Sequence, residues 1–235
     1  MCIRDRCQAT SAPSSAVTTL RLMAGHELAT EGFRPGQVGS SAMPHKMNAR
    51  SSERINGLRL VLDGHLTMAS GLAGRQWNEG DVSCSVVRRV MLPDAFMAAD
   101  GLLQTALGVF DEFGIFPAVI HAELRRDLPF LATTRILTAA VDAGLGRETA
   151  HELIKEHAVA AALDRREVDS GHGLIERLDH DPRVPLDAAT LHELLAQPED
   201  FVGTAVEQVA RVCARAADVV GRHPLAAVAA PEVRV

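Results

Sequence analysis

Residues Gly39–Asn48 read Gly-Ser-Ser-Ala-Met-Pro-His-Lys-Met-Asn, and this stretch says more about the chain than any other. Two serines follow a glycine, a proline favours a turn, and a lysine and an amide close the segment. Downstream, Ser51-Ser52-Glu53 has the composition of a helix start and precedes apolar residues at helical spacing. We therefore expect a loop that leads into the N-terminus of a helix, where free backbone N–H groups favour anions.

The side chains of this loop could support the removal of a proton. A serine hydroxyl is a poor base but its alkoxide is a strong one, and the ammonium of Lys46 would lower the cost of forming it. The same charge and the amide of Asn48 could stabilise a carboxylate or an enolate-like anion. Small residues around the two serines would let the loop open and close over a substrate. An ordinary surface loop, in which Ser, Pro and Asn only make turns, is the alternative that these residues leave open.

The pattern Gly-Ser-Ser-x-Met-Pro-x-Lys-x-Asn resembles the signature of the fumarase/aspartase superfamily. His45, before the lysine, is similar to the adenylosuccinate lyase branch, because argininosuccinate lyases usually carry Gln there and fumarases Gly. The likeness to this branch runs from about Ala16 to Val219. It also rests on the segments Arg50-Ser-Ser-Glu-Arg54, Gln76-Trp-Asn-Glu79, Ser85-Val-Val-Arg-Arg89 and Leu128-Pro-Phe-Leu-Ala-Thr133.

The resemblance implies an all-α fold and a homotetramer whose active sites combine loops from three subunits. It implies β-elimination of fumarate from adenylosuccinate, giving AMP, and from the succinylated imidazole ribotide of purine biosynthesis. Neither a metal nor an organic cofactor takes part in such a reaction. Argininosuccinate lyase is the nearest rival in the superfamily, and His45 and the Gln76–Arg89 motif argue against it.

The resemblance also assigns roles to single residues. Ser40 matches the base that removes the carbon-bound proton. Lys46 and Asn48 would stabilise the substrate carboxylate and the carbanionic intermediate. The positions implied to hold the substrate are Ser41, Met43, Arg54, Ser85 and Arg89.

The Ser85–Arg89 segment has a physical argument of its own. Residues four apart lie on one face of a helix, and a hydroxyl beside a guanidinium suits a phosphate or a carboxylate. Solvated helix charges are the alternative for Arg88 and Arg89. Gly80 stands where many adenylosuccinate lyases carry an arginine, so one anion contact is missing or comes from another residue.

None of the ten histidines lies in the motif of the family's general acid, which precedes this part of the family sequence. We therefore expect a fragment that is inactive alone, with residues 1–7 as a non-native start. A non-catalytic, oligomerising fragment is the alternative from a different class. His151-Glu-Leu-Ile-Lys155 lacks the second histidine of a zinc-binding helix, so we expect no metal site.

Composition limits the partners. The net charge is −6 with both signs interspersed, which disfavours a nucleic-acid partner but allows a positive pocket for a small anion. Four cysteines show no paired spacing, so we expect a reducing cytoplasm. No apolar run reaches membrane-spanning length, and the first residues lack the apolar core of a signal peptide. The 47% hydrophobic content with only 3% aromatics favours helix-on-helix packing.

Two regions are expected. Residues 8–113 should form a segment of a long-helix bundle that contains the loop 34–48, and residues 114–235 a smaller helical domain. Periodicity predicts helices over 52–72, from 81 or 83 to 113, and over 151–166, with a kink or a break at Pro93. Residues 169–185 read as a surface loop or insertion, and the tail after His223 as loosely ordered.

Overall fold

The computed structural model describes residues 3–32, 43, 46–75, 77, 81–167 and 173–224. Its elements are almost entirely helical, which confirms the expected all-α class. The chain divides into two compact units between Val119 and Ile120. The sequence placed this division at Gly114, but a strand pair holds Gly114 and Ile115 in the first unit.

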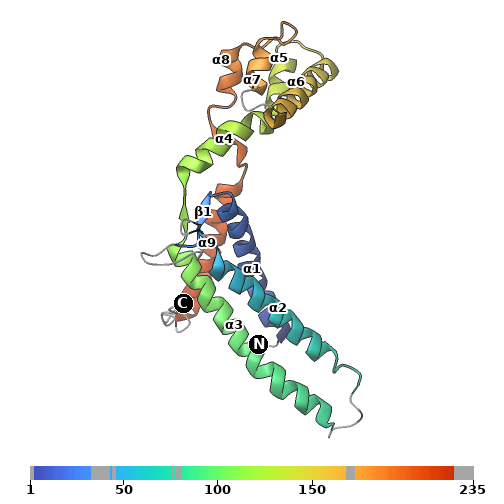
Figure 1. Cartoon of the computed structure of the whole chain (residues 1–235), viewed down its shortest axis with the longest axis vertical. Helices are drawn as coiled ribbons and strands as arrows, with labels where there is room; N and C mark the ends of the chain where they lie inside the picture. Colours follow the sequence, from blue (N-terminus) through green and yellow to red (C-terminus); the bar gives the residue numbers. More distant parts are fainter. Residues whose placement is uncertain are drawn as a thin grey trace. The chain divides into compact units, whose positions relative to one another are not determined.

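Three long helices build the first unit, which we call the bundle. They are α1 (Ile3–Gly25), α2 (Arg50–Ser70) and α3 (Val82–Glu112), and they lie side by side in Figure 1. Their apolar side chains recur at helical spacing and meet in one core. Its fully buried members include Val17, Ile55, Leu62, Ala95 and Leu102.

Helices α2 and α3 run antiparallel, and two contacts fix their register. His65 Nε2 lies 2.7 Å from Asp94 Oδ2. A Cβ on Gly101 would stand 3.8 Å from Leu58 Cδ1. By this register the last turn of α2 lies beside the first turns of α3, so the two helix starts are at opposite ends of the pair.

The start and the middle of α3 follow different sequence signals. Asp81 Oδ1 accepts a hydrogen bond from the Ser83 N–H at 2.8 Å and caps the helix, as the sequence allowed. Three hydrogen bonds hold the pKa of Asp81 below its ordinary value; the hydroxyl of Ser83 contributes most, then the N–H groups of Ser83 and Trp77. The break expected at Pro93 does not occur, because buried residues on both sides, Met91 and Ala95, keep the helix packed in the core.

A short strand pair ties the end of α1 to the end of α3. β1 (Ala29–Thr30) and β2 (Gly114–Ile115) are antiparallel, with Thr30 opposite Gly114. Gly32 follows β1 with a φ of +104°, and a Cβ there would stand 2.7 Å from Glu112 Cβ. Only glycine fits this position, so the chain leaves β1 along a fixed path.

The second unit is built from shorter helices. These are α4 (Pro117–Leu131), whose first residues belong to the bundle unit, α5 (Thr133–Asp142), α6 (Arg147–Glu167), α7 (Leu174–Asp179), α8 (Ala188–Glu193), a 3₁₀ turn over Pro198–Phe201, and α9 (Ala205–Arg222). Helices α5–α8, which we call the α5–α8 cluster, share a core that includes Ile136, Ile154, Leu174, Leu178 and Leu191. Every residue of α9 is exposed.

One expectation fails in this unit. The sequence predicted a surface loop or insertion over residues 169–185, yet α7 buries Leu174, Ile175 and Leu178 in the core. The helix was missed because it has only six residues, with three apolar ones on its buried face, and is flanked by Gly, His, Asp and Pro. Residues 168–172 and 225–235, which include most of the expected tail, lie outside the described residues.

Candidate functional site

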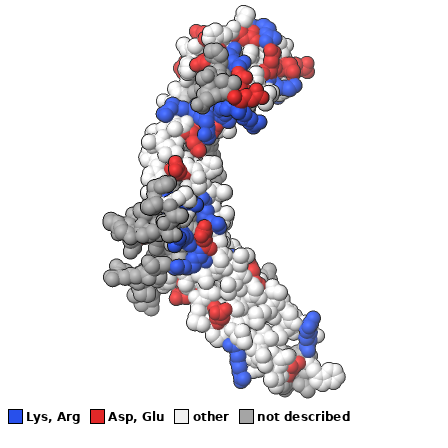
Figure 2. All heavy atoms as spheres, viewed as in Figure 1, with Lys and Arg blue, Asp and Glu red and all other residues white. Residues whose placement is uncertain are grey.

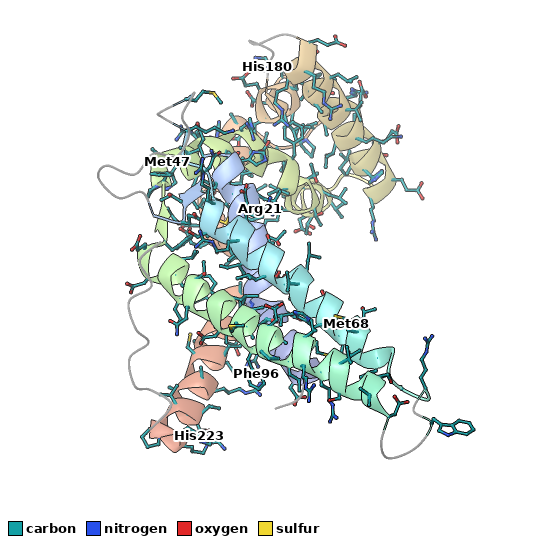
Figure 3. All side chains as sticks on the ribbon, turned by 60° about the horizontal axis from the view of Figure 1, so that its bottom comes forward. Arg21, Met47, Met68, Phe96, His180 and His223 are labelled. Atoms are coloured by element: carbon teal, nitrogen blue, oxygen red, sulfur yellow. The ribbon has the colours of Figure 1, made fainter. Side chains whose placement is uncertain are left out.

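An open pocket of about 880 Å³ lies in the bundle unit, where the end of the signature and the first turn of α2 meet α1 and the residues around the start of α4. Its size is ordinary for a small-molecule site. Its charged and amide side chains are Arg21, Glu27, Lys46, Asn48 and Glu53. Apolar walls come from Leu22, Met47, Phe116 and Val119. In Figure 3, Arg21 and Met47 lie near the same end of the bundle, while Met68 and Phe96 lie further along it.

Backbone turns place the two signature side chains that line this pocket. The Lys46 N–H donates to the carbonyl of Met43 at 3.0 Å, and the Arg50 N–H donates to the carbonyl of Asn48 at 2.9 Å. Lys46 and Asn48 therefore stand on a short, turned segment directly before α2. A lysine ammonium and an amide N–H so placed can both donate to an anion in the pocket.

The start of α2 does bind an anion, but the anion belongs to the protein. Glu31 accepts hydrogen bonds from the Ser51 N–H, the Ser52 N–H and the Ser52 hydroxyl, each at 2.8 Å. The Glu31 residue is only 8% exposed. The expectation that these N–H groups would serve a substrate is therefore wrong for Ser51 and Ser52, whose N–H groups are already bound.

Sequence reasoning missed Arg21, which reaches the pocket from α1. Its guanidinium donates to Asn56 Oδ1 at 2.9 Å and lies 3.9 Å from Glu53 Oε1. Asn56 in turn donates to the carbonyl and hydroxyl of Ser14, both at 2.9 Å. Ser14, Thr18 and Arg21 stand at positions i, i+4 and i+7, so a polar stripe on α1 was the signal that could have revealed this network.

Ser85 and Arg89, the second pair that the sequence predicted to bind an anion, lie on the first turns of α3. Ser85 is half-buried and Arg89 is exposed. By the register of α2 and α3, Arg89 lies level with the last turn of α2, which is 21 residues long. At 1.5 Å per residue, roughly 30 Å separate Arg89 from Lys46 within one chain. A single chain therefore does not bring the two groups together.

The remaining expected site residues have different fates. Ser40, Ser41, His45 and Gly80 lie outside the described residues. Met43 is 44% exposed and is not among the described residues that line the pocket, whereas Met47 is. Arg54 is exposed, whereas its neighbour Glu53 lines the pocket.

Across residues 3–32, 43, 46–75, 77, 81–167 and 173–224, no three His, Cys, Asp or Glu side chains are grouped to bind a metal. His157, in the helix that lacks the zinc motif, pairs with Asp181 at 2.7 Å. In the same ranges, no helix is long and apolar enough to cross a membrane. Cys7, Cys84 and Cys213 carry free thiols.

Comparison with solved structures shows which fold the chain shares. The chain superposes on 3-carboxy-cis,cis-muconate lactonizing enzyme from Pseudomonas putida with a TM-score of 0.74, at 22% identity, over 89% of this chain and 46% of that one. This fold is that of the lyases of the fumarase/aspartase superfamily.

Sequence comparison narrows the class to one family. Residues 129–212 match the model of the adenylosuccinate lyase C-terminus. The chain is 36% identical to adenylosuccinate lyase of Saccharomyces cerevisiae over 192 residues, which are 82% of this chain and 40% of that protein. The enzyme of Pyrococcus horikoshii is 32% identical over 185 residues, 78% of this chain and 39% of its own length. Over the matched residues the chain is similar in sequence to adenylosuccinate lyases, and it spans about 40% of the length of these relatives.

Proposed function

We propose that the chain supplies part of the active site of an adenylosuccinate lyase. The reaction is β-elimination of fumarate from adenylosuccinate, giving AMP, and from the succinylated imidazole ribotide of purine biosynthesis. The observation that carries the proposal is the pocket in which Lys46 and Asn48 of the signature segment stand beside Arg21 and Glu53. The family relationship supports the choice of substrate over that of argininosuccinate lyase.

Each signature residue has one step in the proposed mechanism. Ser40 removes the proton from the carbon next to the carboxylate, and the electron pair left behind forms the C=C bond as the C–N bond breaks. Lys46 and Asn48 stabilise the negative charge that builds up on the carboxylate side. The leaving nitrogen needs a proton, and no histidine is among the described residues that line the pocket. We therefore propose that another chain segment delivers this proton and that the chain alone is inactive.

The substrate phosphate would be bound by Ser85 and Arg89, with further substrate contacts from Ser41, Met43 and Arg54. Since roughly 30 Å separate Lys46 from Arg89 in one chain, the two groups must come from different copies to meet on one substrate. This distance supports active sites that are shared between copies, as in the homotetramer that we propose. The proposed reaction needs neither a metal nor an organic cofactor. The proposed homotetramer would act on its small-molecule substrate in the cytoplasm.

A mixing assay tests the proposal. The purified chain is assayed for fumarate release from adenylosuccinate, alone and together with a full-length relative whose catalytic serine is replaced by alanine. We expect no turnover from either partner and clear turnover from the mixture, because the chain supplies the signature loop and the relative supplies the acid. The Ser40→Ala chain should lower the recovered rate by orders of magnitude, since its role is in the transition state.

Two further variants separate the shared-site proposal from simple recovery of folding. The chain with Arg89→Ala should still restore turnover, because the relative supplies its own phosphate-binding arginine to the mixed site. The chain with Lys46→Met should not. Turnover by the chain alone would show that the acid lies within these residues. A mixture without turnover, from a chain that co-assembles with the relative, would support the non-catalytic, oligomerising alternative.

A further inference from the structure

Glu31 joins residues that lie before and after the signature in the sequence. It directly precedes Gly32, and its carboxylate binds Ser51 and Ser52 at the start of α2. The three contacts at 2.8 Å therefore bring residue 31 beside residues 51 and 52, and we call this point the neck. A contact between two points of a chain that are distant in sequence reduces the number of conformations open to the residues near the contact.

The described contacts of the buried Glu31 carboxylate are with hydrogen-bond donors of α2. Among the residues that the structure describes, no Lys, Arg or His forms an ion pair with Glu31. Its charge is balanced instead by two N–H groups and a hydroxyl at the positive end of α2. Ala49, the residue at the N-cap of α2, makes no side-chain capping bond, so Glu31 caps the helix from a distance in sequence.

The side of the neck that carries Glu31 is fixed to the rest of the bundle. Thr30, next to Glu31, is paired with Gly114 of β2. Gly32, which follows Glu31 in the sequence, has a φ of +104° and lies close to Glu112. Glu31 thus transmits the position of the strand pair to the first turn of α2, and Lys46 and Asn48 lie a few residues before that turn.

We propose that Glu31 is a positioning residue for Lys46 and Asn48, which it holds in the pocket by anchoring the start of α2. The proposal that they act on a substrate rests on the function proposed above. Without the carboxylate, the N–H groups of Ser51 and Ser52 lose their acceptor and the first turn of α2 frays. The turn that joins the Asn48 carbonyl to the Arg50 N–H then loses its support. A glutamine at position 31 would keep one acceptor oxygen and part of the effect.

The test uses the whole chain and the variants Glu31→Ala, Glu31→Gln and Leu62→Val. Leu62 is fully buried in the bundle core, so Leu62→Val is a matched control that lowers stability without touching the neck. NMR follows the amide exchange of Ser51 and Ser52, the backbone signals of Lys46 and the side-chain NH₂ of Asn48. A titration with fumarate, the expected product, gives the affinity of the pocket.

We expect Glu31→Ala to lose exchange protection at Ser51 and Ser52, to shift the signals of Lys46 and Asn48, and to weaken fumarate binding by about tenfold or more. Glu31→Gln should restore part of each effect. Leu62→Val should lower the melting temperature and leave the signals and the affinity unchanged. The proposal is overturned if Lys46 and Asn48 keep their wild-type signals in Glu31→Ala. A wild-type chain that does not bind fumarate would instead count against the proposed function, while the NMR signals would still decide the role of Glu31.

Discussion

The bundle and the α5–α8 cluster solve the problem of stability in different ways. α3 exposes apolar side chains at helical spacing: Val82, Val86 and Val90 near its start, and Leu103, Leu107 and Phe110 near its end. The second unit instead pairs its charges within itself, as in Arg165–Asp127, Arg177–Asp164 and Arg183–Asp181. On the faces visible in Figure 2, charged side chains are sparse over much of the bundle and dense over the second unit.

From this difference we expect the bundle, more than the α5–α8 cluster, to depend on other chains. The bundle holds the pocket with Lys46 and Asn48, an Arg89 too far away to join it, and exposed apolar side chains along α3. The cluster has a closed core and satisfied charges. The match to the family model, residues 129–212, falls on the second unit, whereas the candidate chemistry lies in the first. The match to the family model and the candidate site therefore lie in different regions, whereas the likeness to the curated relatives extends over both.

The largest expected effect concerns assembly. Leu107→Glu in α3 should convert the associated chain to monomers, because a charge placed in an apolar contact must be desolvated without a partner. Val159→Glu in α6 is the matched control, since Val159 is 53% and Leu107 57% exposed. Light scattering after size exclusion gives the mass of each variant. An unchanged mass for Leu107→Glu, or dissociation of Val159→Glu, would contradict the expectation that the bundle and not the cluster carries the contacts between chains.

Core truncations should affect the two regions separately. Leu62→Ala in the bundle and Leu191→Ala in the cluster each remove a fully buried side chain, and each should cost about 2–5 kcal/mol of unfolding free energy. Each region has its own core, so each variant should lower one melting transition and leave the other in place. Calorimetry checks this, and a single transition that both variants lower equally would show that the two cores unfold as one.

The sequence predicted the fold of the bundle well and parts of its site poorly. Apolar periodicity was enough for α2, and the Asp81 cap for the start of α3, because both signals are local. Pro93 pointed to a break that tertiary packing prevented, and α7 was hidden by the polar residues around its short apolar face. Glu31 could not be found at all, because its partners are about twenty positions away and meet it only in the folded bundle. The positions of Ser40 and Ser41 stay predictions.

A smaller effect should appear as pH dependence in the second unit. Hydrogen bonds from the guanidinium and N–H of Arg183, aided by His157, hold the pKa of Asp181 well below its ordinary value of 3.8. A carboxyl whose pKa is lowered by folding stabilises the fold above about pH 4, and this contribution is lost as the pH falls from there toward the folded pKa. Asp181→Asn should therefore cost about 1–3 kcal/mol at pH 7 and progressively less below pH 4.

Thermal unfolding at several pH values measures this difference. Leu191→Ala serves as the control, since its cost comes from a cavity and should not follow the protonation of Asp181. The bundle transition should not respond to Asp181→Asn at any pH. A constant difference between wild type and Asp181→Asn down to pH 2 would mean that the Arg183 and His157 contacts do not stabilise the ionised form.

The smallest expected effects belong to ion pairs within single helices, and they decide whether charge pairing itself stabilises the cluster. Lys155 lies 3.2 Å from Glu152 on α6, and Arg59 lies 2.5 Å from Asp63 on α2. Lys155→Met and Arg59→Met keep the apolar stem and remove only the charge, so each should cost about 0.2–0.5 kcal/mol. Urea unfolding measures the loss of unfolding free energy in each variant. Equal, small losses would show that the cluster is stabilised by its buried core and the Asp181 network. A loss above about 1 kcal/mol for Lys155→Met alone would show that surface charge also stabilises the cluster, because exposed pairs rarely contribute that much.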